Sequence, residues 1–123
     1  MKGDDVVALM TREAILEELL KATIANENMM WMLAALKMAD RPVQKEQLRD
    51  VTNELYKKIH PEVEELPIRS RHLLDEAAAM LEGAALVHVA EVAKSKRYTL
   101  SLLGQEVLHY RHERNLKGKE VKQ

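Results

Sequence analysis

Apolar side chains recur every three or four positions along several stretches of the chain, a spacing that predicts amphipathic helices. The first such stretch is residues 5–24, where Asp4, Asp5 or Thr11 would cap the start of the helix. Residues 29–39 are apolar on nearly every side, which is typical of a helix buried in a core. The amino-terminal third is therefore predicted to form two helices, one at the surface and one inside.

The helical pattern continues through the middle of the chain. Residues 44–59 are amphipathic again, and residues 60–67 form an acidic connector that contains two prolines. A further helix is predicted over residues 70–83. Ser70 is suited to cap its start, and Gly83 is placed where a left-handed residue would close it.

Beyond that glycine the pattern changes from helical to extended. A short apolar strand is predicted at residues 86–89, then a basic turn at 94–97 and a second strand at 98–100. A new helix is expected to open at Ser101, and residues 115–123 have few apolar groups, which predicts a flexible, solvated tail. The expected fold class is mainly α with a small β-hairpin.

Two passages resemble winged helix-turn-helix DNA-binding proteins of the broad MarR and PadR type. Residues 81–87, Leu-Glu-Gly-Ala-Ala-Leu-Val, are similar to the turn that leaves the recognition helix in that family. Residues 96–108 are similar to the passage from the wing to the final helix. The family usually has glycine where this chain has Ala85, and threonine where it has Ser101. The hairpin passage also resembles the partition adaptors of the TubR type.

The resemblance implies a winged helix-turn-helix domain over residues 29–114, with an extra amino-terminal helix in residues 1–28 and a flexible tail in residues 115–123. The extra helix either covers the domain's own core or pairs with a second chain. The family's function implies a homodimer that binds specific double-stranded DNA, as a transcriptional regulator or as a plasmid or phage partition adaptor. A winged helix used for protein–protein contact is the alternative, favoured by the acidic connector.

The resemblance places the candidate DNA contacts at the starts of two helices and on a hairpin. Three groups are predicted to contact DNA: Arg69, Ser70, Arg71 and His72; Lys94, Ser95, Lys96 and Arg97; and Gln44 with Lys45. Residues at the start of a recognition helix reach base edges, and arginine can bond guanine through two hydrogen bonds. Clustered cations on a hairpin suit the phosphate backbone. The structural alternatives are a capped, solvated helix start and an ordinary Lys- and Ser-rich surface turn.

The distribution of charge is more informative than its sum. The net charge of the 123 residues is −1, which by itself argues against a nucleic-acid-binding protein. Residues 1–67 carry 9 Lys and Arg against 13 Asp and Glu, whereas residues 68–123 carry 10 against 7. The predicted hairpin therefore lies in the basic half of the chain.

The residue content gives no indication of an enzyme or of a cofactor. Cysteine is absent, which excludes disulfides, thiolate nucleophiles and zinc–thiolate sites. Neither a Gly-rich phosphate loop nor a His-Glu-x-x-His motif occurs in the sequence. His109 and His112 are three residues apart and could share a helix face, but no third ligand is evident and Glu113 is expected on a different face. We therefore expect no metal site.

Two further expectations concern the surroundings of the protein. Trp31 with Met29, Met30 and Met32 could line a cavity for a small-molecule effector, although packing in the core is the favoured interpretation. No apolar run approaches the roughly 20 residues that span a bilayer, and no secretory leader is recognisable. A cytoplasmic protein without a membrane partner is expected.

Overall fold

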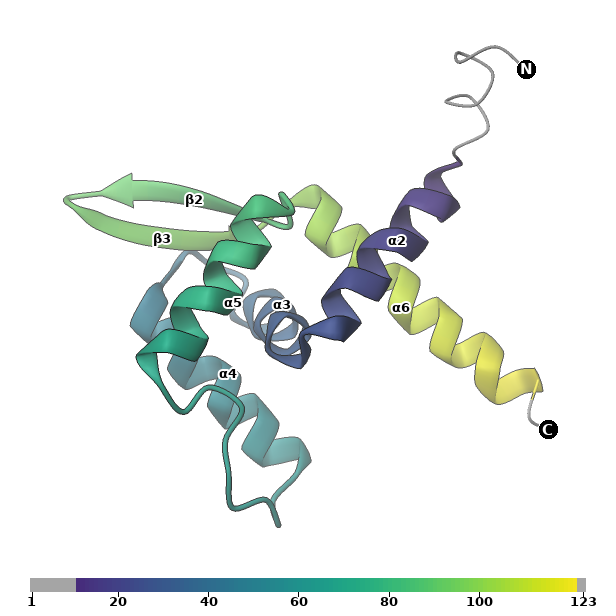
Figure 1. Cartoon of the computed structure of the whole chain (residues 1–123), viewed down its shortest axis with the longest axis horizontal. Helices are drawn as coiled ribbons and strands as arrows, with labels where there is room; N and C mark the ends of the chain where they lie inside the picture. The colour runs from purple at the N-terminus through teal and green to yellow at the C-terminus, as the bar shows by residue number, and fades with distance from the viewer. Residues whose placement is uncertain (1–10, 122–123) are drawn as a thin grey trace.

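The computed structural model describes residues 11–121, with side chains described up to residue 116. This part of the chain is mainly helical with one small antiparallel sheet, which confirms the expected fold class in its main features and is compatible with a winged helix (Figure 1). The elements in chain order are α2 (Arg12–Ala25), α3 (Glu27–Ala39), β1 (Val43–Gln44), α4 (Lys45–Ile59), α5 (Arg71–Gly83), β2 (Val87–Val92), β3 (Ser95–Leu100) and α6 (Leu102–Val121). Across these residues, no helix combines the length and the apolar character that a membrane crossing requires.

Side-chain caps decide where the first two helices begin. Helix α2 starts after Thr11, whose hydroxyl oxygen accepts a hydrogen bond from the Ala14 N–H at 3.1 Å, so the later of the predicted starts is observed. The other candidate caps lie outside the described residues. Asn26 ends α2 and caps α3, because its side-chain oxygen accepts from the N–H groups of Asn28 and Met29. Helix α3 therefore begins two residues earlier than the apolar run predicts.

Helix α3 is the centre of the core, as its apolar sequence predicts. Its buried residues are Met29, Met30, Met32, Leu33, Ala35 and Leu36. Trp31 instead lies half-buried at the surface, where its ring meets the edge of Tyr56 with centroids 4.9 Å apart. Helix α2 contributes Leu16 and Leu20 to the same core. Thus the three methionines pack in the interior, and the amino-terminal helix covers the domain's own core.

The sheet contains one strand more than the hairpin that the sequence predicts. Strand β1 joins the outer side of β3, with Val43 opposite Tyr98, to give the order β1-β3-β2. Two residues are too short a segment for an alternating pattern to be recognised. Val43 and Tyr98 are both buried, so this extra strand fixes the start of α4 against the core.

The hairpin turn lies earlier than predicted, and the strands are longer. The pairing of β2 with β3 continues outward to Val92 opposite Ser95, which leaves Ala93 and Lys94 as a two-residue turn. Both turn residues have positive φ angles, 51° and 67°, as such tight turns require. Residues 95–97 are therefore strand rather than turn, because they pair with residues 90–92 of β2.

Helix α5 closes through Ala85 and not through Gly83, contrary to the sequence prediction. Gly83 is the last helical residue, whereas Ala85 has a φ of 60°. The Leu86 N–H donates to the Leu81 carbonyl at 3.0 Å, and the Ala85 N–H donates to the Glu82 carbonyl at 3.0 Å. These two bonds define a Schellman motif whose left-handed residue is Ala85. The strained position is the one at which the resembled family usually has glycine.

Two substitutions test this assignment of the helix end. Ala85→Gly is expected to stabilise the fold by about 0.5–1 kcal/mol, because the left-handed conformation costs a residue with a Cβ about 1–2 kcal/mol and the freedom of glycine in the unfolded chain offsets part of the gain. Gly83→Ala is expected to stabilise by about 0.5 kcal/mol, since a Cβ there meets no atom within 4 Å. Urea unfolding followed by circular dichroism measures both. A destabilised Gly83→Ala variant would place the left-handed residue at 83 instead.

Helix α6 extends through the segment predicted to be a flexible tail. Residues 115–121 are helical, and only residues 122–123 of the predicted tail lie outside the described part. The segment has few apolar residues and includes Gly118, but it continues a helix that is already formed, and its Lys, Glu and Leu residues are good helix formers. Figure 1 shows α6 crossing α2 on the side of the molecule away from the hairpin tip.

Candidate nucleic-acid interface

The first turn of α5 presents the first group of predicted contacts. Ser70 is the cap of this helix, and its hydroxyl oxygen accepts from the Leu73 N–H at 3.2 Å. Arg69, Arg71 and His72 extend into solvent, with side chains that are 60%, 66% and 84% exposed. These three side chains are accessible to a ligand, whereas the Ser70 hydroxyl already caps the helix.

Each cation at this helix start has a carboxylate neighbour. Arg71 lies 3.2 Å from Glu46 and 3.5 Å from Asp75. Arg69 approaches Glu65 at 3.9 Å. Such exposed ion pairs contribute little to stability, so they leave these cations able to bind a further ligand. These carboxylate partners were not predicted from the sequence. The spacing of four residues from Arg71 to Asp75 was the available signal, because it places the two on one helix face.

His72 also has a carboxylate neighbour, in the next turn of α5. The His72 Nε2 atom lies 3.3 Å from Glu76 Oε2, four residues further along the helix. Asp75, Glu76 and Glu82 are all exposed on α5. The outer surface of this helix is therefore cationic only at its beginning and carries carboxylates along the rest of its length.

Lys45 joins two helices rather than extending into solvent. Its ammonium group lies 2.9 Å from Asp75 Oδ1, and its side chain is only 24% exposed. This hydrogen bond raises the pKa of Lys45 and holds the pKa of Asp75 below its usual range. Gln44 ends strand β1 and precedes α4, where its backbone N–H donates to the Gln47 side chain at 3.3 Å. Lys45 therefore connects α4 to α5, and Gln44 connects strand β1 to the first turn of α4.

The hairpin carries the second group of predicted contacts at its outer end. Lys94 forms the tip, and Lys96 is exposed on the strand behind it. Among the side chains that the structure describes, the ion pairs involve neither of these lysines. Ser95 and Arg97 are half-buried on the opposite face of the ribbon, and the Arg97 Nε atom is buried without a hydrogen-bond partner in the described structure. Lys94 and Lys96 are thus the exposed cations of the hairpin, and Arg97 is only partly exposed.

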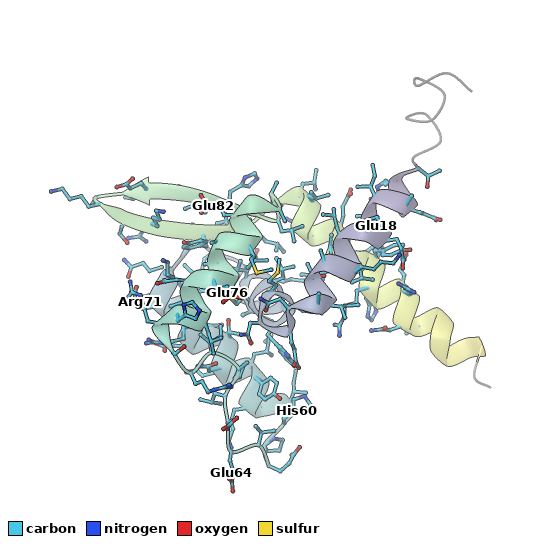
Figure 2. All side chains as sticks on the ribbon, in the orientation of Figure 1. Glu18, His60, Glu64, Arg71, Glu76 and Glu82 are labelled. Carbon is cyan, nitrogen blue, oxygen red and sulfur yellow. The ribbon has the colours of Figure 1, made fainter. Side chains whose placement is uncertain are left out.

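The hairpin and the start of α5 project from the same side of the molecule. In Figure 1 the tip of the β2–β3 hairpin and the first turn of α5 both extend away from the crossing of α2 and α6. Figure 2 shows Arg71 on this side, with Glu76 and Glu82 further along α5. The two predicted clusters therefore lie on the side of the molecule away from the crossing of α2 and α6. Cations lie on this side at the hairpin tip and at the helix start, and the carboxylates Glu76 and Glu82 lie further along α5.

The histidines of α6 differ in one respect from the sequence expectation. His109 Nε2 lies 3.1 Å from Glu113 Oε1, so Glu113 shares the face of His109 and the expectation of a different face is wrong. Four residues is slightly more than one helical turn, which accounts for the contact. Within the described residues, no three His, Asp or Glu side chains gather into a group that could hold a metal ion.

A groove of about 780 Å³ lies between the end of α3, the end of β3 and the start of α6. Its floor is apolar, through Leu36, Pro42 and Leu100, and charged residues surround its rim. Trp31 is not part of its lining. The groove is therefore not the effector cavity that Trp31 and the neighbouring methionines could line.

Comparison with known proteins adds no assignment. No protein-family model matches the chain, and the search of curated proteins finds no significant match.

Proposed function

We propose that this protein is a winged helix-turn-helix protein that binds double-stranded DNA as a homodimer and regulates transcription. The observation that supports it most is the common side from which the cationic hairpin tip and the cationic start of α5 project. In this proposal α5 enters the major groove, and the hairpin lies along the phosphate backbone. Helix α4 crosses behind α5 and supports it through the bond of Lys45 to Asp75.

The connector between α4 and α5 departs from the usual helix-turn-helix and is held by a side chain. It spans residues 60–70, whereas the turn usually takes three or four residues. Asn53 of α4 donates to the Ile68 carbonyl at 2.9 Å and accepts from the Ile68 N–H at 3.1 Å. Ile68 itself is buried. The two bonds fix the chain just before Arg69, so the longer connector still presents α5 in one orientation.

A binding titration at several salt concentrations tests the proposal. The wild-type chain is added to a labelled duplex of about 20 base pairs with random sequence, since two half-sites one helical turn apart need about that length. Binding is expected to weaken as salt rises, in a linear log–log relation whose slope reflects the number of phosphates neutralised. Binding that is absent at low salt, or that does not depend on salt, contradicts the proposal.

The dimer is expected to form through the helices at the two ends of the described chain. Ile15 and Ile24 of α2 and Leu116 of α6 are between 44% and 58% exposed, which leaves apolar groups on both helices without cover. Sedimentation equilibrium is expected to give twice the 14.1 kDa mass of one chain. Ile24→Glu should shift the protein toward monomer, because it places a charge on the proposed interface. A monomeric wild-type protein at tens of micromolar contradicts this arrangement.

The second candidate function is a protein-interaction module, and a specific observation favours it. The exposed face of α5 carries Asp75, Glu76 and Glu82, and the cations at its start already have carboxylate partners. A surface of this kind also fits a basic protein. Failure to bind any duplex at low salt, together with a folded dimer, would favour this candidate over DNA binding. A partition adaptor would bind DNA as proposed, and would differ by recognising an array of repeated sites.

A further inference from the structure

The Arg71 guanidinium group is held between two carboxylates that come from different helices. Asp75 lies one turn further along α5, with its Oδ1 atom 3.5 Å from Arg71 Nε. Glu46 belongs to the first turn of α4, and its Oε1 atom lies 3.2 Å from Arg71 Nη1. The arginine is therefore oriented from its own helix and from the helix behind it, although its side chain is 66% exposed.

Asp75 is the more firmly fixed of the two carboxylates. Lys45 binds the same oxygen at 2.9 Å, and the lysine is mostly covered by its surroundings. The lysine hydrogen bond lowers the pKa of Asp75 further below its ordinary value, so the carboxyl group is ionised at neutral pH and remains so well into the acidic range. A permanent negative charge thus stands beside Arg71, on the surface that is proposed to enter the major groove.

This combination is poorly suited to phosphate but well suited to one kind of base pair. Carboxylates repel the phosphate backbone, so they weaken binding that does not depend on sequence. In the major groove, arginine donates two bonds to guanine O6 and N7, and a carboxylate accepts from the cytosine N4 amino group. Arg71 with its two neighbours therefore offers the donors and the acceptor that a G·C pair, or two adjacent G·C pairs, would satisfy.

We infer that Arg71, Asp75 and Glu46 act as one unit that reads G·C, with Arg71 bonding guanine and a carboxylate accepting from cytosine. The inference rests on the proposed DNA-binding function and assigns the sequence selectivity of that site. Asp75 and Glu46 are specificity-determining residues in this account. They orient Arg71 toward a base edge and keep it from making a sequence-independent phosphate contact.

Selection from a pool of randomised duplexes of about 20 base pairs, using the full chain, tests the inference. The wild type is expected to enrich G·C at one fixed position in each half-site. Asp75→Asn and Glu46→Gln, made separately, should each reduce that preference about tenfold. Both should bind unselected duplex several-fold more tightly, with a log–log salt slope steeper by about 1, since Arg71 is then free to contact a phosphate.

Glu76→Gln is the matched control. It removes the same charge from the next position on α5, and Glu76 contacts His72 rather than Arg71. This variant is expected to bind unselected duplex somewhat more tightly through the charge change alone, and to keep the wild-type preference for G·C. If Asp75→Asn lowers stability by losing the Lys45 bond, Glu46→Gln decides the test, because Glu46 contacts Arg71 and leaves that bond intact.

The outcomes separate this inference from the function on which it rests. A wild type that binds duplexes but enriches no G·C position, or variants that all keep the wild-type preference, overturns the inference and leaves DNA binding standing. An equal loss of preference in the Glu76→Gln control also overturns it, since the effect would then be one of total charge. A wild type that binds no duplex overturns the proposed function and this inference with it.

Discussion

Gly104→Ala is expected to destabilise the fold by about 3 kcal/mol or more, and to prevent folding at physiological temperature. A Cβ at this position would clash with the backbone carbonyl of Leu86 and with the Leu100 side chain. Overpacking in a dense interior commonly costs about 1–3 kcal/mol, and the cost is higher where the obstructing atoms belong to the backbone and cannot change rotamer. The first turn of α6 would have to move away from the sheet.

The reason for this sensitivity is a compact junction between three elements. The Ser101 N–H donates to Leu86 O at 3.1 Å, and the Ser101 hydroxyl donates to Ala85 O at 2.8 Å. The same hydroxyl oxygen accepts from the Gly104 N–H at 2.9 Å. Ser101 is only 3% exposed, so a shift of α6 that breaks these hydrogen bonds would leave buried donors and acceptors without partners.

Denaturant unfolding measures the effect, with Gly83→Ala as the matched control. Both variants add one methyl group to a glycine near the same junction, but only position 104 lacks space for it. The expected result is a large loss for Gly104→Ala and a small gain for Gly83→Ala. A loss below about 1 kcal/mol for Gly104→Ala would mean that α6 approaches β2 less closely than the structure describes.

Replacing the two hairpin lysines by glutamate is expected to have the largest effect on function. Lys94→Glu with Lys96→Glu should weaken binding to random duplex by more than about 100-fold at low salt, and should reduce the salt slope by about 2, because two phosphate contacts are lost and two repulsions are added. Both side chains are exposed, so little change in the free energy of unfolding is expected. Fluorescence anisotropy with a labelled duplex gives the affinity and the slope together.

The control for this experiment makes the same change of charge elsewhere. Lys58→Glu with Arg111→Glu reverses two exposed cations, one at the end of α4 and one in α6, and both sites lie away from the hairpin tip in Figure 1. This variant is expected to lose only the few-fold affinity that a change in total charge produces. If the two double variants weaken binding equally, the hairpin has no special role.

The order of the elements was largely predictable from the sequence. The apolar periodicity indicates α3, α4 and α5, Ser70 is recognisable as a cap, and the extended segments after α5 pair as a hairpin. The positions of the turns were not predictable. Ala93, Lys94 and Ala85 adopt left-handed conformations that glycine usually occupies. Glycine positions in the sequence therefore do not mark these turns. Strand β1 is visible only through its pairing with β3.

The candidate site was predictable as a set of residues but not as an electrostatic environment. Arg69, Arg71 and the hairpin lysines stand out by type and by place. Their partners come from segments far apart in the chain, as in the pairs of Lys45 with Asp75 and of Arg71 with Glu46. Only the packing of α4 against α5 brings these charges together, and this packing changes a simple cationic helix start into one of mixed charge.

The central claim is that the start of α5 and the tip of the hairpin together form one DNA-binding surface. The most direct test is an NMR titration of the isotope-labelled chain with a duplex of about 20 base pairs, following every backbone amide. We expect the largest chemical-shift changes at residues 69–72 and 94–97, with weaker changes across α2 and on the distal end of α4. Changes confined to other elements, or no changes at low salt, would contradict the account.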